Sequence, residues 1–418
     1  MKPRGEKLVV FKLAWRSLWR NKRRTLITLS SIALGLAFAV FFASFVTGMH
    51  KRTIGDMTRM LAGHITVEHA KFREDPAAGW FVPSIARVQS LASTYPEIEI
   101  VKPIVLAQAM VSVANGSSGA VLMGVDPRVE AEVSLFAHRI VKGRYLAPDD
   151  AKGVLIGKRL SERLKLDLDS KVVLTTVDAH GESSDTLLRV IGIFETASDE
   201  IDLGILQVTL ATAQKILALE PDQATQVGLV LSDWNTQTRV LEGLRRDLAG
   251  PLVSVRPWQD LMPQIASWLL MSGTITRVLG IIIIVLVTAT ILNTILMSVL
   301  ERSREFAVLL ALGTPPRLLR SQVMTESIIL GILGSAAGAL LGGGCALFFA
   351  TRGIDLAWAS GGEFSVGGFA VDLKIRTYLD PSNLVFLAVM VFVFTVMAGV
   401  WPAVRSTRID LARALRLR

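Results

Sequence analysis

Residues 25–48 read TLITLSSIALGLAFAVFFASFVTG, a stretch without a single charged side chain. About 20 consecutive apolar residues suffice for a helix to cross a bilayer. The next apolar run of that length begins only near Val278, and two more follow it. The spacing therefore predicts one membrane crossing, then roughly 230 mostly polar residues, then three further crossings.

The composition of the whole chain agrees with several crossings. Of the 418 residues, 51% are hydrophobic, and the mean hydropathy of +0.48 is higher than soluble domains carry. Short β-like runs alternate with helical segments across residues 49–276. We therefore predict an α-helical integral membrane protein with a large mixed α/β domain inserted between helices 1 and 2. The four transmembrane helices, arranged as one plus three, span residues 25–48, 277–300, 322–350 and 383–404.

Lysine and arginine residues gather in three segments outside the predicted spans, namely residues 1–24, 301–321 and 405–418. An excess of positive charge in short loops marks the cytoplasmic side of an inner membrane. We therefore expect both termini and the 301–321 loop in the cytoplasm, and residues 49–276 in the periplasm. The pI of 9.8 then reflects contact with anionic membrane lipids, and we expect no nucleic-acid partner.

Residues 1–24 are typical of an amphipathic elbow helix on the cytoplasmic face. Aromatic and basic residues recur there at helical spacing. Tryptophan rings favour the headgroup layer, and arginines favour the lipid phosphates. The membrane-interface residues that we predict are Trp15, Arg16, Trp19 and Arg20.

Two of the predicted spans carry small residues at every fourth position. They are Gly35 and Ala39 in the first span, and Gly334, Gly338 and Gly342 in the third. Such stripes allow helix backbones to approach closely in a membrane. Packing within the chain and packing against a second permease subunit explain them equally well.

No group of residues indicates catalysis or metal binding. The five histidines lack metal-ligand spacing, and the single cysteine, Cys345, lies in the third span. Residues 153–159 (GVLIGKR) superficially resemble a phosphate-binding loop. They are one residue short, and Arg159 replaces the Ser or Thr that Mg²⁺ requires. We expect no catalytic, cofactor or metal site in this chain, so ATP and Mg²⁺ would be bound by a partner.

The loop after the second span reads ERSREFAVLLALGTPP over residues 301–316 and resembles the E-R-x-R-E-x-(x)4-A-L-G signature of the FtsX-like permease domain. Residues 13–26 (LAWRSLWRNKRRTL), 401–405 (WPAVR) and 412–416 (ARALR) are similar to other parts of the same class, the MacB/LolC/LolE permeases of ABC transporters. The resemblance covers essentially the whole chain. It implies ATPase-coupling residues, which are Glu301, Arg302, Arg304, Glu305, Phe306, Leu309, Leu310, Leu312 and Gly313.

The resemblance also implies partners and a mechanism. The chain would be a permease subunit that pairs with a second one, identical or paralogous, and binds a pair of ABC ATPase subunits. Residues 301–321 would form a coupling helix whose apolar side chains enter a groove of the ATPase. The alternative is a plain connecting helix that rests on lipid. ATP-driven movement of the ATPases would reach the periplasmic domain, whose distal insert we place at about 111–224, as mechanotransmission.

Three branches of this class imply different roles. The MacB branch serves efflux and usually carries its ATPase in the same chain. The FtsX branch relays the ATPase state to a periplasmic hydrolase or sensor, and its external domain is smaller. Residues 63–69, 71–76 and 192–210 look most like the LolC/LolE branch, which moves lipoproteins. The hairpin tip at 178–185 is shorter than the hook expected of a subunit that recruits a periplasmic carrier. The external loop at 351–382 receives no role.

Overall fold

The computed structural model describes residues 3–407, except residues 61, 197, 249, 251, 356–364, 367–368 and 371–373. The chain forms two compact units. The helical unit comprises Met1–His50, Leu270–Leu356 and Lys374–Arg418, and the α/β unit comprises Lys51–Leu269 and Ala357–Leu373. Most of the predicted cytoplasmic tail and much of the 351–382 loop lie outside the described residues.

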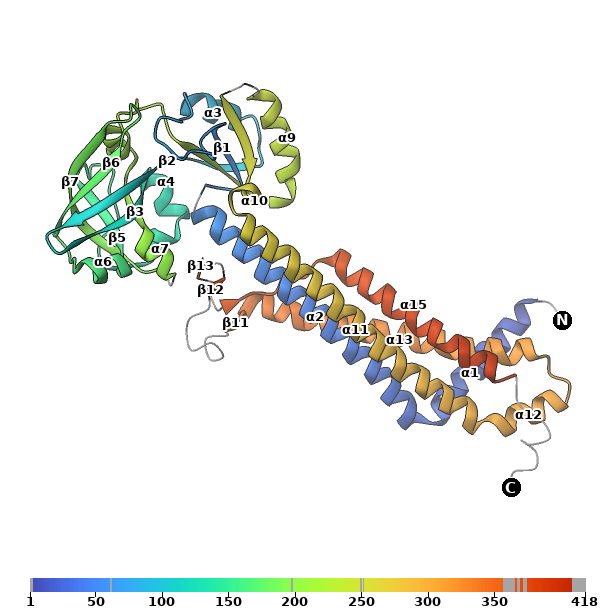
Figure 1. The fold of residues 1–418 in the computed structure, drawn as a ribbon. Helices are drawn as coiled ribbons and strands as arrows, with labels where there is room; N and C mark the ends of the chain where they lie inside the picture. The colour runs from blue at the N-terminus through green and yellow to red at the C-terminus, as the bar shows by residue number, and fades with distance from the viewer. Residues whose placement is uncertain are drawn as a thin grey trace. The chain divides into compact units, whose positions relative to one another are not determined.

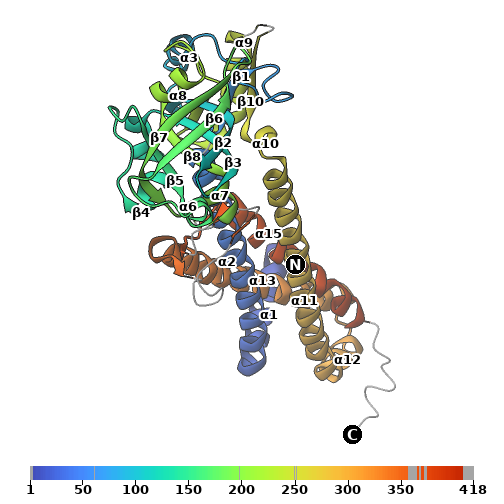
Figure 2. The ribbon, with the colours of Figure 1, turned by 60° about the vertical axis from the view of Figure 1, so that its left-hand side comes forward.

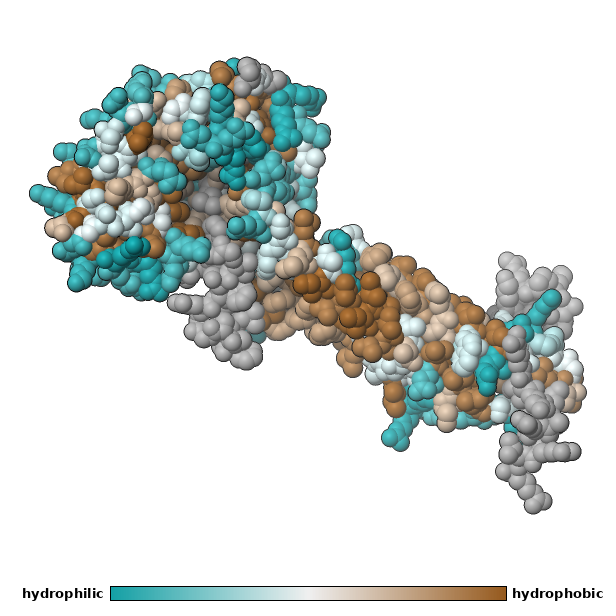
Figure 3. Space-filling model, in the orientation of Figure 1, coloured by the Kyte–Doolittle hydropathy of each residue, from teal (hydrophilic) through white to brown (hydrophobic). Residues whose placement is uncertain are grey.

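In the described part of the chain, four helices are long and apolar enough to cross a membrane (Figure 1). They are α2 (Lys22–Met60), α11 (Pro263–Glu301), α13 (Pro316–Arg352) and α15 (Pro381–Arg405). Hydrophobic side chains cover much of their visible surface (Figure 3). Two shorter helices, α1 (Pro3–Arg20) and α12 (Ser303–Ala311), belong to the same unit. With the α/β unit between α2 and α11, this arrangement confirms the predicted fold class.

Helices α2 and α11 are longer than the spans expected from hydropathy. Each has 39 residues, which corresponds to about 58 Å at 1.5 Å per residue. The hydrocarbon core of a bilayer is only about 30 Å thick. Helix α2 continues past residue 48 to Met60, and α11 begins at Pro263. Each helix therefore contributes residues to both units.

The glycine stripe of α13 is filled by α2 of the same chain. A Cβ atom at Gly338 would lie 2.8 Å from Leu36 Cβ and 2.9 Å from the carbonyl oxygen of Ala33. Gly334 and Gly342, one turn away on either side, meet neighbouring residues of α2 in the same way. No methyl group fits at such distances, so glycine is what allows the two backbones to touch. Packing within the chain accounts for this stripe.

The small residues of α2 also pack within the chain. A Cβ atom at Gly35 would overlap the side chain of Val287 on α11. Ala39 is buried. Helix α2 is thus in close contact with both α11 and α13.

The α/β unit contains a sheet of ten strands among the described residues (Figure 2). Its order is β10-β1-β9-β2-β3-β8-β5-β7-β4, and β6 pairs with both β2 and β7. The strands are β1 (Ile65–His69), β2 (Ile98–Val113), β3 (Gly116–Val125), β4 (Ile140–Gly143), β5 (Gly153–Gly157), β6 (Lys171–Val177), β7 (Ser183–Phe194), β8 (Ile205–Thr209), β9 (Gln226–Leu231) and β10 (Val253–Pro257).

The pairings of β6 close six strands into a ring of β2, β3, β8, β5, β7 and β6. A closed ring leaves no unpaired strand edge. On the other side of β2, the strands β9, β1 and β10 continue as an open sheet. The long strand β2 belongs to both parts. The boundary that we expected near residue 111 falls inside this strand, so the two parts share it.

Helices cover the sheet and complete its core. Buried side chains of α3 (Ile85–Ala92), α8 (Leu210–Ile216) and α9 (Gln237–Asp247) pack in the same apolar cluster as the strands β1, β2 and β9. The β6–β7 connection is a short turn in which the Asp178 carboxylate accepts hydrogen bonds from the backbone of His180 and Glu182. The helices are α3 (Ile85–Ala92), α4 (Pro127–Val133), α5 (Leu135–His138), α6 (Lys158–Leu164), α7 (Asp199–Gly204), α8 (Leu210–Ile216), η1 (Trp234–Thr236), α9 (Gln237–Asp247) and α10 (Trp258–Leu261).

Candidate functional site

The local sequence explains why a separate short helix lies between α11 and α13. Helix α11 ends at Glu301, and Arg302 leaves the helical conformation before α12 begins at Ser303. At the other end, Gly313 has a φ of +86°, and the backbone of Thr314 donates to the carbonyl of Leu309. This is the Schellman arrangement that glycine favours. Two prolines follow, and the second opens α13 because its ring presets the first helical residue.

Arg302 is the centre of the site. Its guanidinium lies 2.9 Å from the Glu326 carboxylate on α13 and also donates to the hydroxyl of Ser17 on α1. The same group lies 4.9 Å from the ring of Phe306, a cation–π contact. The side chains of Arg302 and Glu326 are only 13% and 7% exposed. One residue therefore ties the start of α12 to both α1 and α13.

The two glutamates of the motif pair with the basic N-terminal segment. Glu301 lies 2.6 Å from Arg24, and Glu305 lies 2.9 Å from Arg20. The hydrogen bond from Arg20 lowers the pKa of the Glu305 carboxyl below its ordinary value. These pairs are largely exposed, so each contributes about 0–1 kcal/mol to stability.

The two faces of α12 differ in exposure. Phe306 is 1% exposed and packs in the core of the helical unit, with Leu310 partly buried beside it. The prediction that Phe306 is available to a partner is therefore wrong, because the chain's own core encloses the ring. Leu309 and Leu312 are exposed, Leu312 by 78%. Between Ser303 and Gly313, the exposed residues are Arg304, Glu305, Val308, Leu309, Ala311, Leu312 and Gly313.

Helix α1 presents three faces. Val10, Ala14 and Leu18 are buried. The rings of Phe11, Trp15 and Trp19 form an exposed row, in which Phe11 stacks on Trp15 and Trp15 meets Trp19 edge-on. Arg16 and Arg20 are also exposed. An amphipathic helix at a bilayer surface has such an aromatic row beside a basic one. Arg20, predicted only as an interface residue, also pairs with α12 through Glu305.

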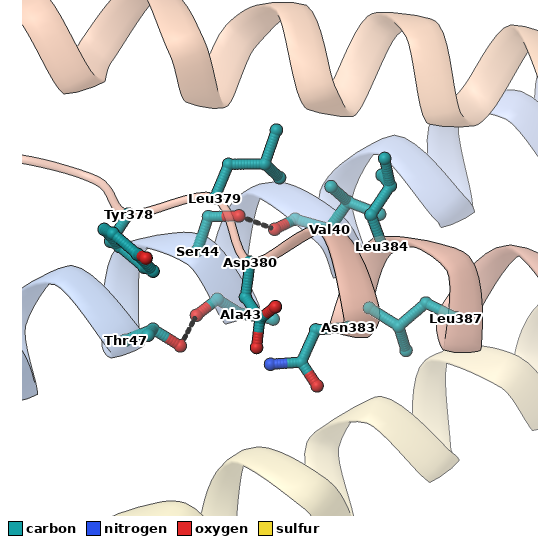
Figure 4. Close-up of a pocket in the computed structure, with 10 residues that line it drawn as sticks. All are labelled: Val40, Ala43, Ser44, Thr47, Tyr378, Leu379, Asp380, Asn383, Leu384 and Leu387. Carbon is teal, nitrogen blue, oxygen red and sulfur yellow. Dashed lines mark hydrogen bonds between the residues drawn. The ribbon is translucent and has the colours of Figure 1, made fainter. Parts of the chain in front are cut away.

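The opposite end of the helical unit contains a small hollow between α2 and the start of α15 (Figure 4). The backbone of Tyr378 donates to the carbonyl of Ser44, and Thr377 donates to that of Ala346. The segment before α15 is thus tied to both α2 and α13. The hollow has room for about one water molecule, so it is too small for a substrate.

The phosphate-loop resemblance does not produce a site. Residues 153–164 form β5 and α6, and the helix begins directly after the strand. The backbone of Asp202 occupies the space beside Gly157. Lys158 pairs with Glu195, and Arg159 pairs with Asp199, both at 2.6 Å. Within the described residues, no group of three or more His, Cys, Asp or Glu could hold a metal ion.

Sequence reasoning missed four residues of this site: Ser17, Arg24, Val308 and Glu326. One signal was available, because an acidic residue inside an apolar helix needs a partner. Glu326 is such a residue in α13. Ser17 and Arg24 had no comparable signal, since nothing in their own segment indicates what they contact.

Comparison with known proteins gives two family matches. Residues 25–246 match the MacB-like periplasmic core domain, and residues 277–411 match the FtsX-like permease C-terminal domain. The chain is 26% identical over 415 residues to the lipoprotein-releasing system transmembrane protein LolC of Xylella fastidiosa, and the match covers 96% of each chain. It is 22% identical over 428 residues to LolE of the lipoprotein-releasing system of Haemophilus influenzae, covering 97% of this chain and 98% of that one.

A further relative is longer than this chain. The chain is 23% identical over 428 residues to the pyoverdine export ATP-binding/permease protein PvdT of Pseudomonas syringae. The match covers 99% of this chain and 60% of that one.

Proposed function

We propose that this chain, which belongs to the MacB-like and FtsX-like family of ABC transporter permeases, is the permease subunit of an ATP-driven mechanotransmission transporter. It is embedded in a membrane, and we place it in the inner membrane with both termini cytoplasmic and residues 49–276 periplasmic. In this proposal a pair of ABC ATPase subunits binds the exposed side of α12, and a second permease subunit completes the transporter. ATP and Mg²⁺ are bound by the ATPases.

The proposal rests mainly on the different surroundings of the two sides of α12. One face is anchored by Arg302, Phe306 and their contacts, and the other exposes Leu309 and Leu312. An exposed apolar face on a rigidly held helix suits a hydrophobic groove of a partner. If these leucines faced water, their exposure would cost solvation free energy, and a hydrophobic groove of a partner removes that cost.

The anchoring also supports a route for movement. A push on α12 reaches α13 through the Arg302–Glu326 pair and reaches α1 through Ser17. Helices α2 and α11 are each continuous over 39 residues, so displacement at one end would be carried to the other. The mechanism needs no channel through the helical unit.

For the cargo, we propose a lipoprotein or a similar amphipathic molecule at the periplasmic face of the membrane. The support is the similarity to LolC and LolE along nearly the full length of the chain. A MacB-like efflux permease is the second candidate, and the similarity to the export protein PvdT favours it.

The test is a pull-down of the tagged full-length chain from its native membrane, followed by mass spectrometry. The variant Leu309→Asp/Leu312→Asp places charge on the exposed face of α12. Leu252→Asp, at a leucine of the α/β unit that is 57% exposed, is the matched control. We expect an ABC ATPase to co-purify with the wild type and the control, and to be lost from the double variant.

Two results would contradict the proposal: no ATPase with any of the three proteins, or equal retention by the double variant. A lipid-anchored protein among the retained molecules would identify the cargo class, whereas a retained adaptor or small-molecule exporter component would favour the efflux role.

A further inference from the structure

The C-terminal end of α2 is enclosed within the α/β unit. Met60 is 4% exposed, and the backbone of Gly63 donates to the carbonyl of Thr58. The last carbonyls of a helix have no partner inside the helix. Here the carbonyl of Arg59 accepts a hydrogen bond of 2.7 Å from the Lys102 ammonium group. A side chain of the sheet therefore caps the end of this long helix.

Lys102 is held by a buried ion pair. Its Nζ lies 2.5 Å from Glu130 Oε1, and the two side chains are 2% and 1% exposed. Neither carboxylate oxygen of Glu130 has another hydrogen-bond partner among the described residues. Burial lowers the pKa of Lys102, and the Glu130 charge opposes this. Each charge thus depends on the other to remain inside the protein.

A requirement for stability alone does not explain this pair, because apolar side chains of similar size often stabilise a core as well as a buried ion pair. What an ammonium group adds is direction, because it donates to the helix end while its charge pairs with a carboxylate. It also matches the negative end of the helix dipole at a C-terminus.

The three groups come from three different parts of the fold. Arg59 is in the last turn of α2. Lys102 is on β2, beside Gly228 of β9, where the open sheet adjoins the closed ring. Glu130 is on α4, which follows the ring strand β3. A Cβ atom at Gly228 would lie 2.5 Å from the carbonyl oxygen of Ala62, so the backbone just after α2 packs directly on β9.

We infer that Lys102, positioned by Glu130, is the joint that makes the end of α2, the shared strand β2 and helix α4 move as one body. Under this inference, a displacement of α2 passes into both the open sheet and the closed ring. The inference deepens the mechanotransmission mechanism and rests on the proposed function for its role in transport. The physical connection itself is a property of this chain alone.

The first experiment is hydrogen exchange of the full-length chain in detergent. Single substitutions leave a buried charge without its partner, so the informative variant is Lys102→Met/Glu130→Leu, which fills the site with apolar atoms. We expect it to fold and to unfold thermally close to the wild type. We expect amides of the last turn of α2 to exchange at least tenfold faster than in the wild type, with β1 and β9 unchanged.

A matched control removes a different ion pair, in which only the carboxylate is buried. Glu68 is fully buried and pairs with Arg256 at 3.2 Å, joining strands β1 and β10 without touching a helix end. Glu68→Leu/Arg256→Met should leave the last turn of α2 at its wild-type rate. If the Lys102→Met/Glu130→Leu variant also leaves that turn unchanged, Lys102 is not the joint and the inference is overturned.

The second experiment adds the ATPase that co-purifies with the chain, and compares exchange with and without ATP and vanadate. In the wild type, we expect nucleotide to change exchange in both α12 and α4. In the Lys102→Met/Glu130→Leu variant, the change in α12 should persist and the change in α4 should fall at least threefold.

The two reporters separate two kinds of failure. If α12 never responds to nucleotide, the proposed function fails, and the exchange of the chain alone still tests the joint. If α12 responds and α4 responds equally in wild type and variant, the movement reaches the ring by another route and the inference is overturned.

Discussion

Two buried ion pairs, one in each unit, hold this protein together in different ways. Arg302–Glu326 lies in the helical unit, and the guanidinium has further contacts with Ser17, Glu305 and Phe306. Lys102–Glu130 lies in the α/β unit, and its carboxylate has no second hydrogen-bond partner among the described residues. The Arg302–Glu326 pair therefore belongs to a network with several contacts, whereas the Glu130 carboxylate depends on Lys102 alone. The protein should therefore tolerate damage to the first better than damage to the second.

The largest expected effect is that of Lys102→Met. It leaves the Glu130 carboxylate buried without a counter-charge, so it should lower the free energy of unfolding by about 3–5 kcal/mol. Thermal unfolding of the purified full-length chain measures this loss. The double variant Lys102→Met/Glu130→Leu should recover most of it. A double variant as unstable as the single one would mean that the ion pair itself, rather than the uncompensated charge, is required for folding.

Arg302→Leu should have a smaller effect, near the lower end of that range at about 3 kcal/mol, because the pair is slightly exposed. Arg302→Lys keeps the charge but cannot reproduce the planar fork that reaches Ser17 and Glu326 together. We expect it to lie between Arg302→Leu and the wild type in the same unfolding measurement. A loss larger than that of Lys102→Met would reverse the comparison of the two pairs.

The contact between α2 and α13 depends on volume rather than charge. Gly338→Ala introduces a methyl group 2.8 Å from Leu36, which should cost about 1–3 kcal/mol of stability. Gly344→Ala, on the same helix, is the control, since nothing lies within 4 Å of the added atom. The two variants should differ clearly in thermal unfolding. Equal midpoints would show that the helical unit adjusts its packing at little cost.

The smallest effect is expected for the exposed pair of Arg20 and Glu305. Glu305→Gln should change stability by less than about 1 kcal/mol, because both side chains are about half exposed. The folded-state pKa of Glu305 is lowered. Its contribution is therefore complete above the unfolded-state pKa of about 4.3 and is lost as the pH falls through the lower folded-state value. Comparing wild type and Glu305→Gln between pH 7 and pH 3 checks both size and direction, and a difference that grows towards low pH would contradict the assignment.

The glycine stripe shows how far sequence reasoning extended into packing. The four-residue spacing of Gly334, Gly338 and Gly342 predicted a close helix contact, and the structure has one. Spacing alone could not say which helix fills the stripe, since any helix with a matching surface would do. The stripe is filled by α2 of the same chain, and only the folded path of the chain brings these two helices together.

Phe306 illustrates the opposite case. A short amphipathic helix has an apolar face, and sequence alone assigned that face to a partner. The structure divides the apolar residues, with Phe306 in the core and Leu309 and Leu312 exposed. The Arg302 contacts hold the Phe306 side of α12 against the core, so only part of its apolar surface remains for a partner.

Sequence alone predicted the one-plus-three arrangement of the spans. The short cytoplasmic helix was expected over residues 301–321, but α12 covers only Ser303–Ala311 and α13 already begins at Pro316. Hydropathy, glycine and proline act through neighbours in the chain, so their effects are readable locally. Three features follow only from the folded chain: Arg302 meets Glu326, β2 belongs to both parts of the sheet, and Lys102 caps α2. A buried charge needs a partner that can come from anywhere in the chain, and neither lysine nor glutamate indicates in its own segment which one the fold will bring to it.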